Sequence, residues 1–150
     1  MKIISFIGVI CIAGVLSGCS LPRVIVLDDP LGPEEHLNLG VAYEKRGEFD
    51  NALKEYREAA RKLPVAYLYM GNVFLQMNDY SGAEANYKEA LEKEPGNSDA
   101  CNNLAWLYYL KKENLETAES LALKAMELNP SKKEIYQDTL DRIREYRKVR

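Results

Sequence analysis

The stretch LNLGVAYEKRGEFDNALKEYREAARKLP, residues 37–64, decides the fold of this chain. Its glycine Gly40 returns as Gly71 after 31 residues, and its alanine Ala52 returns as Ala83 after the same interval. Self-similarity at a fixed period of about 20 to 50 residues is the signature of supersecondary units that stack on one another. The sequence therefore predicts stacked helical hairpins.

Three copies share a small residue, an aromatic residue one helical turn later, a series of alanines and a closing proline. The first copy contains Leu39-Gly40, Tyr43, Gly47, Phe49, Ala52, Tyr56, Ala59 and Pro64. The second contains Met70-Gly71, Phe74, Tyr80, Ala83, Tyr87, Ala90 and Pro95. The third contains Leu104-Ala105, Tyr108, Ala118, Ala122, Ala125 and Pro130.

Each shared residue type has a physical reason. Gly40 and Gly71 lack a Cβ, so a second helix can cross closely there. Proline lacks an amide proton and clashes with the preceding turn. We therefore expect the second helix of each hairpin to end before Pro64, Pro95 or Pro130.

This pattern resembles the tetratricopeptide repeat, a helix-turn-helix unit of about 34 residues. The resemblance covers residues 33–130 and implies an all-α fold, in which three repeats form a short right-handed α-solenoid. Residues 131–150 are predicted to form a C-terminal capping helix, because a repeat array needs a last helix with a polar outer face. Its apolar residues make a narrow stripe of Ile135, Leu140, Ile143 and Tyr146.

The spacing departs from regularity in two places. Pro64 and Gly71 are 7 residues apart, whereas the corresponding interval in the next link is 10. Three residues are thus missing between repeats one and two, which predicts a tight link and a shortened helix end. Tyr108 and Ala118 are 10 residues apart instead of 9, which predicts one extra residue in the turn at 111–116.

The first twenty residues resemble a bacterial lipoprotein signal. Lys2 precedes an apolar run over residues 3–16, and Leu16-Ser17-Gly18-Cys19 follows. The resemblance implies removal of residues 1–18 as a signal peptide, acyl chains such as palmitate on Cys19, and an extended tether over 19–32. A transmembrane anchor needs about 20 apolar residues, more than this run has. An ordinary secretory signal, leaving Cys19 as a free thiol, stays as the alternative.

Charge and composition restrict the partners. Without Lys2 the mature chain has 19 basic and 23 acidic residues, and this mild acidity argues against nucleic acid. The last twenty residues have seven basic and four acidic side chains, which we interpret as a solvated helix face; contact with anionic lipid or an acidic partner is the alternative. The apolar residues 24–27 are interpreted as an N-terminal cap on the first hairpin, or else as a docking segment for a partner.

Nothing in the sequence indicates catalysis. Cys101 falls on a helix face that the repeats predict to be packed, so we interpret it as a core residue. His36 is the single histidine, which leaves no companion for a metal site or a proton relay. The prediction is a protein that is not an enzyme, with no catalytic residue, metal or other cofactor.

The resemblance implies that a peptide or protein partner lies along the concave face of the first helices. The family's positions on that face map to Leu37, Asn38, Val41, Glu44, Lys45, Leu68, Tyr69, Asn72, Leu75, Gln76, Asn102, Asn103, Trp106, Tyr109 and Leu110. Asparagine both donates and accepts, so it can bond an extended backbone, and large aromatic side chains dominate many interfaces. We therefore predict the partner-binding groove to consist of Asn38, Val41, Tyr69, Asn72, Asn103, Trp106 and Tyr109.

Trp106 has an alternative role, and the groove lacks one of the family's binding features. Trp106 could instead pack as ordinary core against the next helix. The family's clamp for C-terminal carboxylates needs basic side chains where this chain has Leu37, Asp99 and Asn103. Recognition of chaperone tails is therefore not expected.

The sequence as a whole predicts a membrane-tethered adaptor of the bacterial cell envelope. Its clients, by resemblance to other lipoproteins of this kind, are pilus, secretion, outer-membrane or cell-wall machinery. Ser20 after the lipid cysteine resembles an outer-membrane sorting signal, so the protein would face the periplasm. One alternative is a detached accessory module of a papain-like peptidase system, whose repeat tails resemble residues 27–40 and 101–105. The other is a self-associating structural lipoprotein; the oligomeric state is left open.

Overall fold

The computed structural model describes residues 30–149. Contacts divide the chain into two units, Met1–Pro30 and Leu31–Arg150, and the fold below belongs to the second unit. The predicted signal peptide, the lipid site Cys19 and the apolar residues 24–27 all lie outside the described residues.

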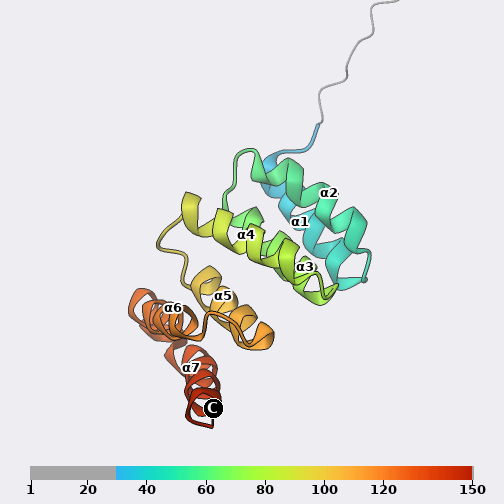
Figure 1. Cartoon of the computed structure of the whole chain (residues 1–150). Helices are drawn as coiled ribbons and strands as arrows, with labels where there is room; N and C mark the ends of the chain where they lie inside the picture. Colours follow the sequence, from blue (N-terminus) through green and yellow to red (C-terminus); the bar gives the residue numbers. More distant parts are fainter. Residues whose placement is uncertain (1–29, 150) are drawn as a thin grey trace, which may run out of the picture. The chain divides into compact units, whose positions relative to one another are not determined.

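The described residues are all-helical, which confirms the predicted fold class (Figure 1). They contain seven α-helices and one turn of 3₁₀-helix, η1, and no strand occurs between residues 30 and 149. The elements are α1 (Pro33–Lys45), α2 (Phe49–Ala60), α3 (Val65–Gln76), α4 (Tyr80–Lys93), α5 (Ser98–Lys111), α6 (Leu115–Leu128), η1 (Pro130–Lys132) and α7 (Lys133–Lys148).

Successive helices pair into hairpins. The most extensive contacts join α1 with α2, α3 with α4 and α5 with α6, and each hairpin then packs against the next. The first helix of each hairpin, α1, α3 or α5, corresponds to the first helix of a repeat. Buried alanines and aromatic residues fill the space between layers, among them Ala52, Tyr56, Ala83 and Tyr87, each at 0% exposure.

Glycines in α1 and α3 make room for tyrosines of the second helices. A Cβ added to Gly40 would lie 2.5 Å from Cδ1 of Tyr56. A Cβ added to Gly71 would lie 2.4 Å from Cε1 of Tyr87, closer than real contacts allow. The third hairpin solves the same problem differently, because both counterparts are buried alanines: Ala105 on α5 and Ala122 on α6. Because Ala122 has no ring, α5 can carry a Cβ at residue 105.

The three residues that are missing between repeats one and two shorten helix ends; the link itself keeps its length. The links α2–α3 and α4–α5 both contain four residues, 61–64 and 94–97. Compared with α4, α2 stops two residues earlier in its repeat, and α3 starts one residue later than α5. The predicted shortening of a helix end is therefore correct, and the predicted tight link is wrong.

The extra residue of the third repeat lengthens α5, so its predicted place in the turn is wrong. The turn 112–114 has three residues, as do 46–48 and 77–79. Its conformation differs from the first turn, because Lys112 and Asn114 both have positive φ, 59° and 49°. The first turn instead uses Gly47, the residue type that adopts this region at least cost.

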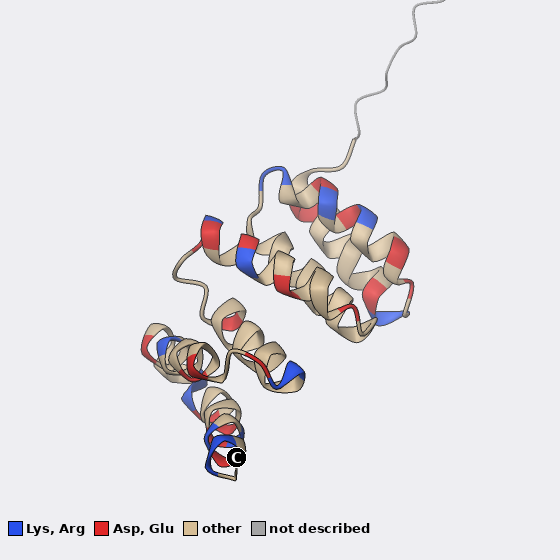
Figure 2. Ribbon diagram, viewed as in Figure 1, with Lys and Arg blue, Asp and Glu red and all other residues tan. Residues whose placement is uncertain are grey.

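The C-terminal helix α7 packs on α6 and α5 through Tyr136, Leu140 and Ile143, all at most 1% exposed. Their i, i+4, i+7 spacing defines one face of a helix. Ile135, which was predicted to belong to this stripe, is 63% exposed, because it lies about 100° around the helix from Tyr136. The blue segments of α7 in Figure 2 mark its basic residues. Of these, Arg144 donates to Glu119 of α6, and Arg142 to Asp138 of α7.

Cys101 is completely buried, as predicted for a core residue. It packs with Ala125 of α6 and Tyr136 of α7. Burial raises the pKa of its thiol. Its place in the core therefore accounts for its presence without any chemical role.

Candidate functional site

A hollow of about 390 Å³ lies between α1 and α3, on the side of the first helices. Its lining comes from both helices: Val41, Glu44, Lys45, Tyr69, Asn72 and Gln76. We call it the Glu44 hollow. It brings together three of the seven predicted groove residues, namely Val41, Tyr69 and Asn72. Its volume falls at the lower end of the range of small-molecule pockets, of about 300 to 1,000 Å³.

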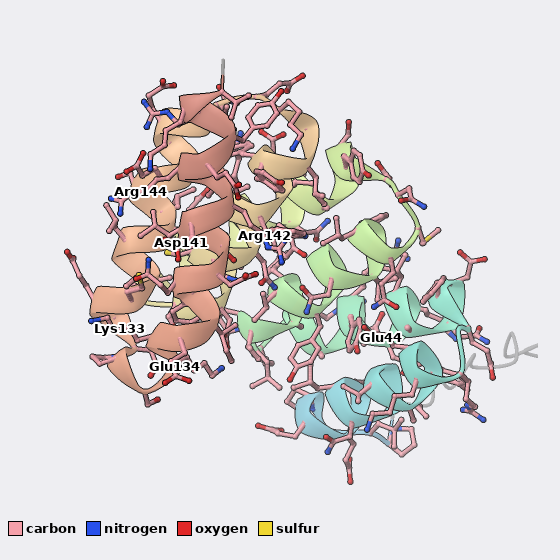
Figure 3. All side chains as sticks on the ribbon, turned by 90° about the horizontal axis from the view of Figure 1, so that it is seen from below. Glu44, Lys133, Glu134, Asp141, Arg142 and Arg144 are labelled. Carbon is pink, nitrogen blue, oxygen red and sulfur yellow. The ribbon has the colours of Figure 1, made fainter. Side chains whose placement is uncertain are left out.

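The carboxylate of Glu44 is held from two directions. The Tyr56 hydroxyl on α2 donates to Oε2 at 2.6 Å, and Nε2 of Gln76 on α3 donates to Oε1 at 2.5 Å. Figure 3 shows Glu44 on the side of α1 that faces α3. Burial, together with this carboxylate, raises the pKa of Tyr56, so the hydroxyl stays a donor at physiological pH. Glu44 is thus oriented by side chains of two other helices.

Asn72 is held in a similar way in the second repeat, although its counterpart in the first repeat is Val41 and not Glu44. Its Oδ1 accepts from the Tyr87 hydroxyl on α4 and from Nδ2 of Asn103 on α5, both at 2.9 Å. Burial raises the pKa of Tyr87, so this hydroxyl also remains protonated. The Asn72 amide nitrogen makes no hydrogen bond within residues 30–149, so two donor hydrogens remain for a partner. The structure therefore joins two predicted site residues, Asn72 and Asn103, in one contact.

Both contacts depend on the glycines described above. Tyr56 passes beside Gly40 to reach Glu44, and Tyr87 passes beside Gly71 to reach Asn72. The second helices therefore supply hydroxyl groups to the groove although their own backbones lie behind it.

Aromatic side chains of α5 and α7 form a cluster that includes two of the predicted groove residues, Trp106 and Tyr109. The rings of Trp106 and Tyr109 on α5 are 5.1 Å apart, and Tyr146 of α7 meets Tyr109 edge-on at 6.2 Å. The ammonium of Lys112 lies 3.6 Å from the Tyr109 ring centroid and 4.2 Å from that of Tyr146. Trp106 is half-buried, and the guanidinium of Arg142 on α7 lies 5.9 Å from its ring centroid. It is therefore neither a fully packed core residue nor a free one.

Asn38 is the predicted groove residue that the structure does not bring into contact with the others. It is exposed on α1 and makes no hydrogen bond within the described part of the chain. The positions that the carboxylate clamp would need are also occupied differently. Leu37 is half-buried, and Asp99 is an acid that accepts from Lys132 at 2.7 Å.

The sequence alone did not reveal the roles of Tyr56 and Tyr87 in the groove. A signal was present: each tyrosine follows its glycine by 16 residues, and the third repeat replaces glycine and tyrosine together by alanine. Glu44 and Gln76 occupied family groove positions, but their hydrogen bond links residues 32 apart and depends on how α1 and α3 cross.

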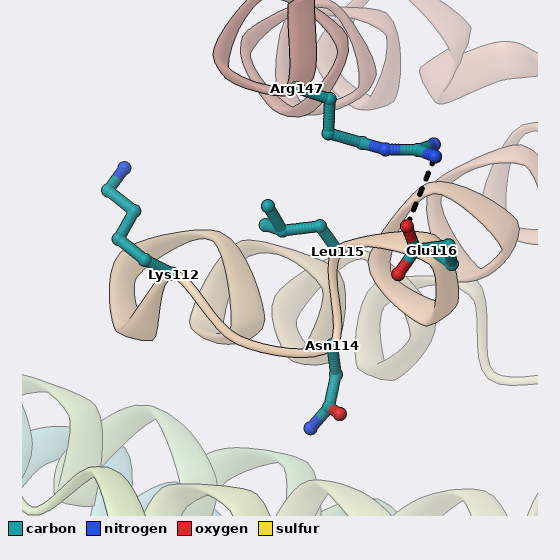
Figure 4. Close-up of a pocket in the computed structure, with 5 residues that line it drawn as sticks. All are labelled: Lys112, Asn114, Leu115, Glu116 and Arg147. Carbon is teal, nitrogen blue, oxygen red and sulfur yellow. Dashed lines mark hydrogen bonds and ion pairs between the residues drawn. The ribbon is translucent and has the colours of Figure 1, made fainter. Parts of the chain in front are cut away.

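A second hollow lies at the turn between α5 and α6, lined by Lys112, Asn114, Leu115, Glu116 and Arg147 (Figure 4). Arg147 reaches in from α7 and pairs with Glu116 at 3.2 Å, and it also pairs with Glu119. Its guanidinium is therefore occupied within the protein, and we assign no ligand to this hollow.

Residues 30–149 contain neither a metal-binding cluster nor a membrane-spanning helix. No group of three or more His, Cys, Asp and Glu side chains there is arranged to hold a metal ion. None of the helices between these residues has the length and apolar character needed to cross a membrane.

The similarity to known proteins lies in the repeat region of the chain. Models of the tetratricopeptide repeat match residues 33–64 and 74–143. Human Protein O-mannosyl-transferase TMTC2 is 34% identical over 101 residues, covering 63% of this chain and 12% of that protein. Its relative from Xenopus laevis is 36% identical over 64 residues, covering 39% and 8%. The chain thus spans only a small part of these relatives, and the matched part consists of repeats.

Solved structures share the fold at low identity. The TPR2B domain of yeast Sti1 in a pHsp70 complex has a TM-score of 0.70 at 19% identity, covering 76% of this chain and 97% of that one. The first TPR of Spaghetti (RPAP3), bound to an HSP90 peptide, has a TM-score of 0.67 at 20% identity, covering 76% and 91%. The Arabidopsis OM64 TPR domain has a TM-score of 0.68 at 20% identity, covering 76% and 95%. With its helices, its hairpin packing and both matched segments in agreement, this chain belongs to the tetratricopeptide-repeat proteins.

Proposed function

We propose that this protein is a membrane-tethered, non-catalytic adaptor of the bacterial cell envelope that binds an extended peptide segment of a partner protein. The fold supports a role in protein–protein interaction, because tetratricopeptide repeats are typically scaffolds and two structural neighbours are complexes with chaperone peptides. The tether, the envelope location and the identity of the partner belong to the proposal.

One observation supports peptide binding most directly: the groove residues are oriented before a ligand arrives. Glu44 and Asn72 are each held by a tyrosine of a second helix and by an amide of the next first helix. Binding then does not have to immobilise these side chains, which saves about 0.5 to 1.5 kcal/mol for each. The free Asn72 donors can bond the carbonyl groups of an extended backbone.

The exposed part of Trp106 extends this surface with a ring of the kind that anchors many interfaces. It lies on α5, the same helix as Asn103, so a peptide bonded to Asn103 passes close to it. We propose Trp106 as the apolar anchor and the asparagines as the backbone contacts.

Photo-crosslinking in intact cells tests this role. A photoreactive residue at position 106 should give one recurrent adduct, identified by mass spectrometry, that disappears when Asn72→Ala is also introduced. A photoreactive residue at Lys124, exposed on α6 of the same repeat, is the matched control and should not give that adduct. Adducts only from position 124, or only with a second copy of the chain, would refute groove binding.

The tether is tested separately. Metabolic labelling with an alkyne fatty acid should label the wild-type protein, and Cys19→Ser should abolish both the label and membrane recovery. Several acyl chains give lasting attachment, because each buried methylene contributes about 0.8 kcal/mol. Separation of the two membranes on a density gradient then tests the outer-membrane location. Unlabelled wild-type protein would refute the lipid anchor without affecting the groove.

A further inference from the structure

We propose that the Glu44 hollow receives a lysine or arginine side chain of the bound peptide. This inference rests on the proposed function and names a feature of the partner's sequence.

Glu44 retains capacity to accept further hydrogen bonds. A carboxylate offers about four lone-pair sites, and the hydrogen bonds from Tyr56 and Gln76 use two of them. Glu44 forms no ion pair with a cation within residues 30–149, although it is half-buried. A half-buried carboxylate that is neutralised by no cation favours a cationic ligand, because hydrogen bonds between charged groups are about twice as strong as neutral ones.

The walls of the hollow match a long cationic side chain in shape and chemistry. Tyr69 lines the hollow with an aromatic ring, which lies 5.4 Å from the ring of Tyr56. A cation over an aromatic face is attracted by the ring quadrupole. Val41 supplies an apolar wall, against which the methylene stem of lysine or arginine can pack. Carboxylate, ring and apolar wall together match a long cationic side chain.

The hollow is lined by one acid and one base, and only the acid is held in place. Glu44 is the one acid in its lining and Lys45 the one base. The two are held differently: Glu44 is fixed by two hydrogen bonds, whereas Lys45 is exposed in the last turn of α1 and forms no ion pair within the described residues. Its ammonium can stay in water while a ligand cation approaches Glu44. Lys45 therefore weakens the site slightly without occupying it.

A linear random-peptide library tests the proposal, with the full-length lipidated protein in nanodiscs as the target. Peptides whose binding is lost with Trp106→Ala should share a lysine or arginine at one position. Glu44→Gln should weaken a synthetic peptide of that sequence by about tenfold, the low end for a hydrogen bond to a charged group. Asp50→Asn, at an exposed acid in the first turn of α2 and outside the hollow, is the matched neutralisation and should leave the affinity unchanged, whereas Lys45→Gln should raise it slightly.

Replacing the peptide's basic residue by norleucine closes a double-mutant cycle. This change should weaken binding to the wild type about tenfold and have no further effect on Glu44→Gln. If Glu44→Gln fails to fold, as judged by circular dichroism, Tyr69→Leu replaces it and should also weaken the lysine peptide more than the norleucine peptide.

Failure of this inference and failure of the proposed function would give different results. Groove-dependent peptides that lack a shared basic residue, or a cycle without coupling, would overturn the inference and leave the adaptor role intact. A library that gives no peptide sensitive to Trp106→Ala would overturn the proposed groove and this inference with it.

Discussion

Gly71 and Tyr87 share one space: a Cβ on residue 71 would lie 2.4 Å from Cε1 of the tyrosine ring. The ring is completely buried and its hydroxyl bonds Asn72, so it has no alternative position to move to. Because Gly71 on α3 has no side chain, Tyr87 of α4 can reach Asn72.

Gly71→Ala should therefore destabilise the protein by about 1 to 3 kcal/mol, the usual cost of overpacking, although alanine is the better helix former. Urea unfolding measures the change. Gly96→Ala is the matched control, because no atom lies within 4 Å of its added Cβ, and its effect should be small. In a Tyr87→Ala background, Gly71→Ala should become neutral or stabilising, as the Ala105 and Ala122 pair of the third repeat indicates.

Tyr87→Phe should lower the free energy of unfolding by about 1 kcal/mol, since the Asn72 oxygen loses one of its two donors. Tyr80→Phe on the same helix is the control, because the Tyr80 hydroxyl bonds nothing within residues 30–149. In a cycle combining Tyr87→Phe with Asn72→Ala, the double variant should be destabilised by less than the sum of the two single variants. Additive effects would show that the hydroxyl does not hold Asn72.

Two isoleucines of α7 test whether this helix is part of the folded array. Ile143 is fully buried, and Ile143→Ala should cost about 2 to 5 kcal/mol. Ile135 is 63% exposed, and Ile135→Ala should change stability by less than about 0.5 kcal/mol. Equal effects in thermal unfolding would mean that α7 does not cap the third hairpin.

Glu84 should make stability depend on pH in the acid range. Hydrogen bonds from Lys111 and Lys88 lower its pKa to about 2 from an ordinary value of 4.5. The unfolded chain therefore takes up this proton first, so the contribution is complete above pH 4.5 and is lost as the pH falls toward 2. Because both lysines are partly exposed, we expect about 1 kcal/mol.

The test compares the wild type with Glu84→Gln by urea unfolding between pH 2 and 7. The difference between the two should be largest at neutral pH and should shrink as the solution is acidified. A difference that stays constant with pH would exclude the ion pair as its cause.

Much of the fold could be predicted from residue types because each repeat needs the same solution to the same packing problem. Gly40, Ala52 and Pro64 stand where helices cross or end, and these demands are local. The placement of insertions was harder. The turn 112–114 looks longer from residue spacing, yet Lys112 adopts a left-handed conformation at the helix end and α5 takes up the extra residue.

The candidate site was less predictable. Family positions pointed to Asn72 and Asn103, but their contact depends on the angle between α3 and α5, which no local pattern encodes. Ile135 could have been placed from the sequence, because it precedes Leu140 by five residues, about 140° around a helix, whereas Tyr136 lies on the same face as Leu140 and Ile143.

The bond between Gln76 and Glu44 and the bond between Asn103 and Asn72 are also the joints between neighbouring repeats. A substitution that alters what the groove recognises at these positions will also alter how sharply one repeat bends against the next. If the proposed groove is the binding site, specificity and curvature are therefore coupled at these four residues. Evolution toward a new partner through them would change both properties together, whereas changes at Trp106 would leave these two bonds in place.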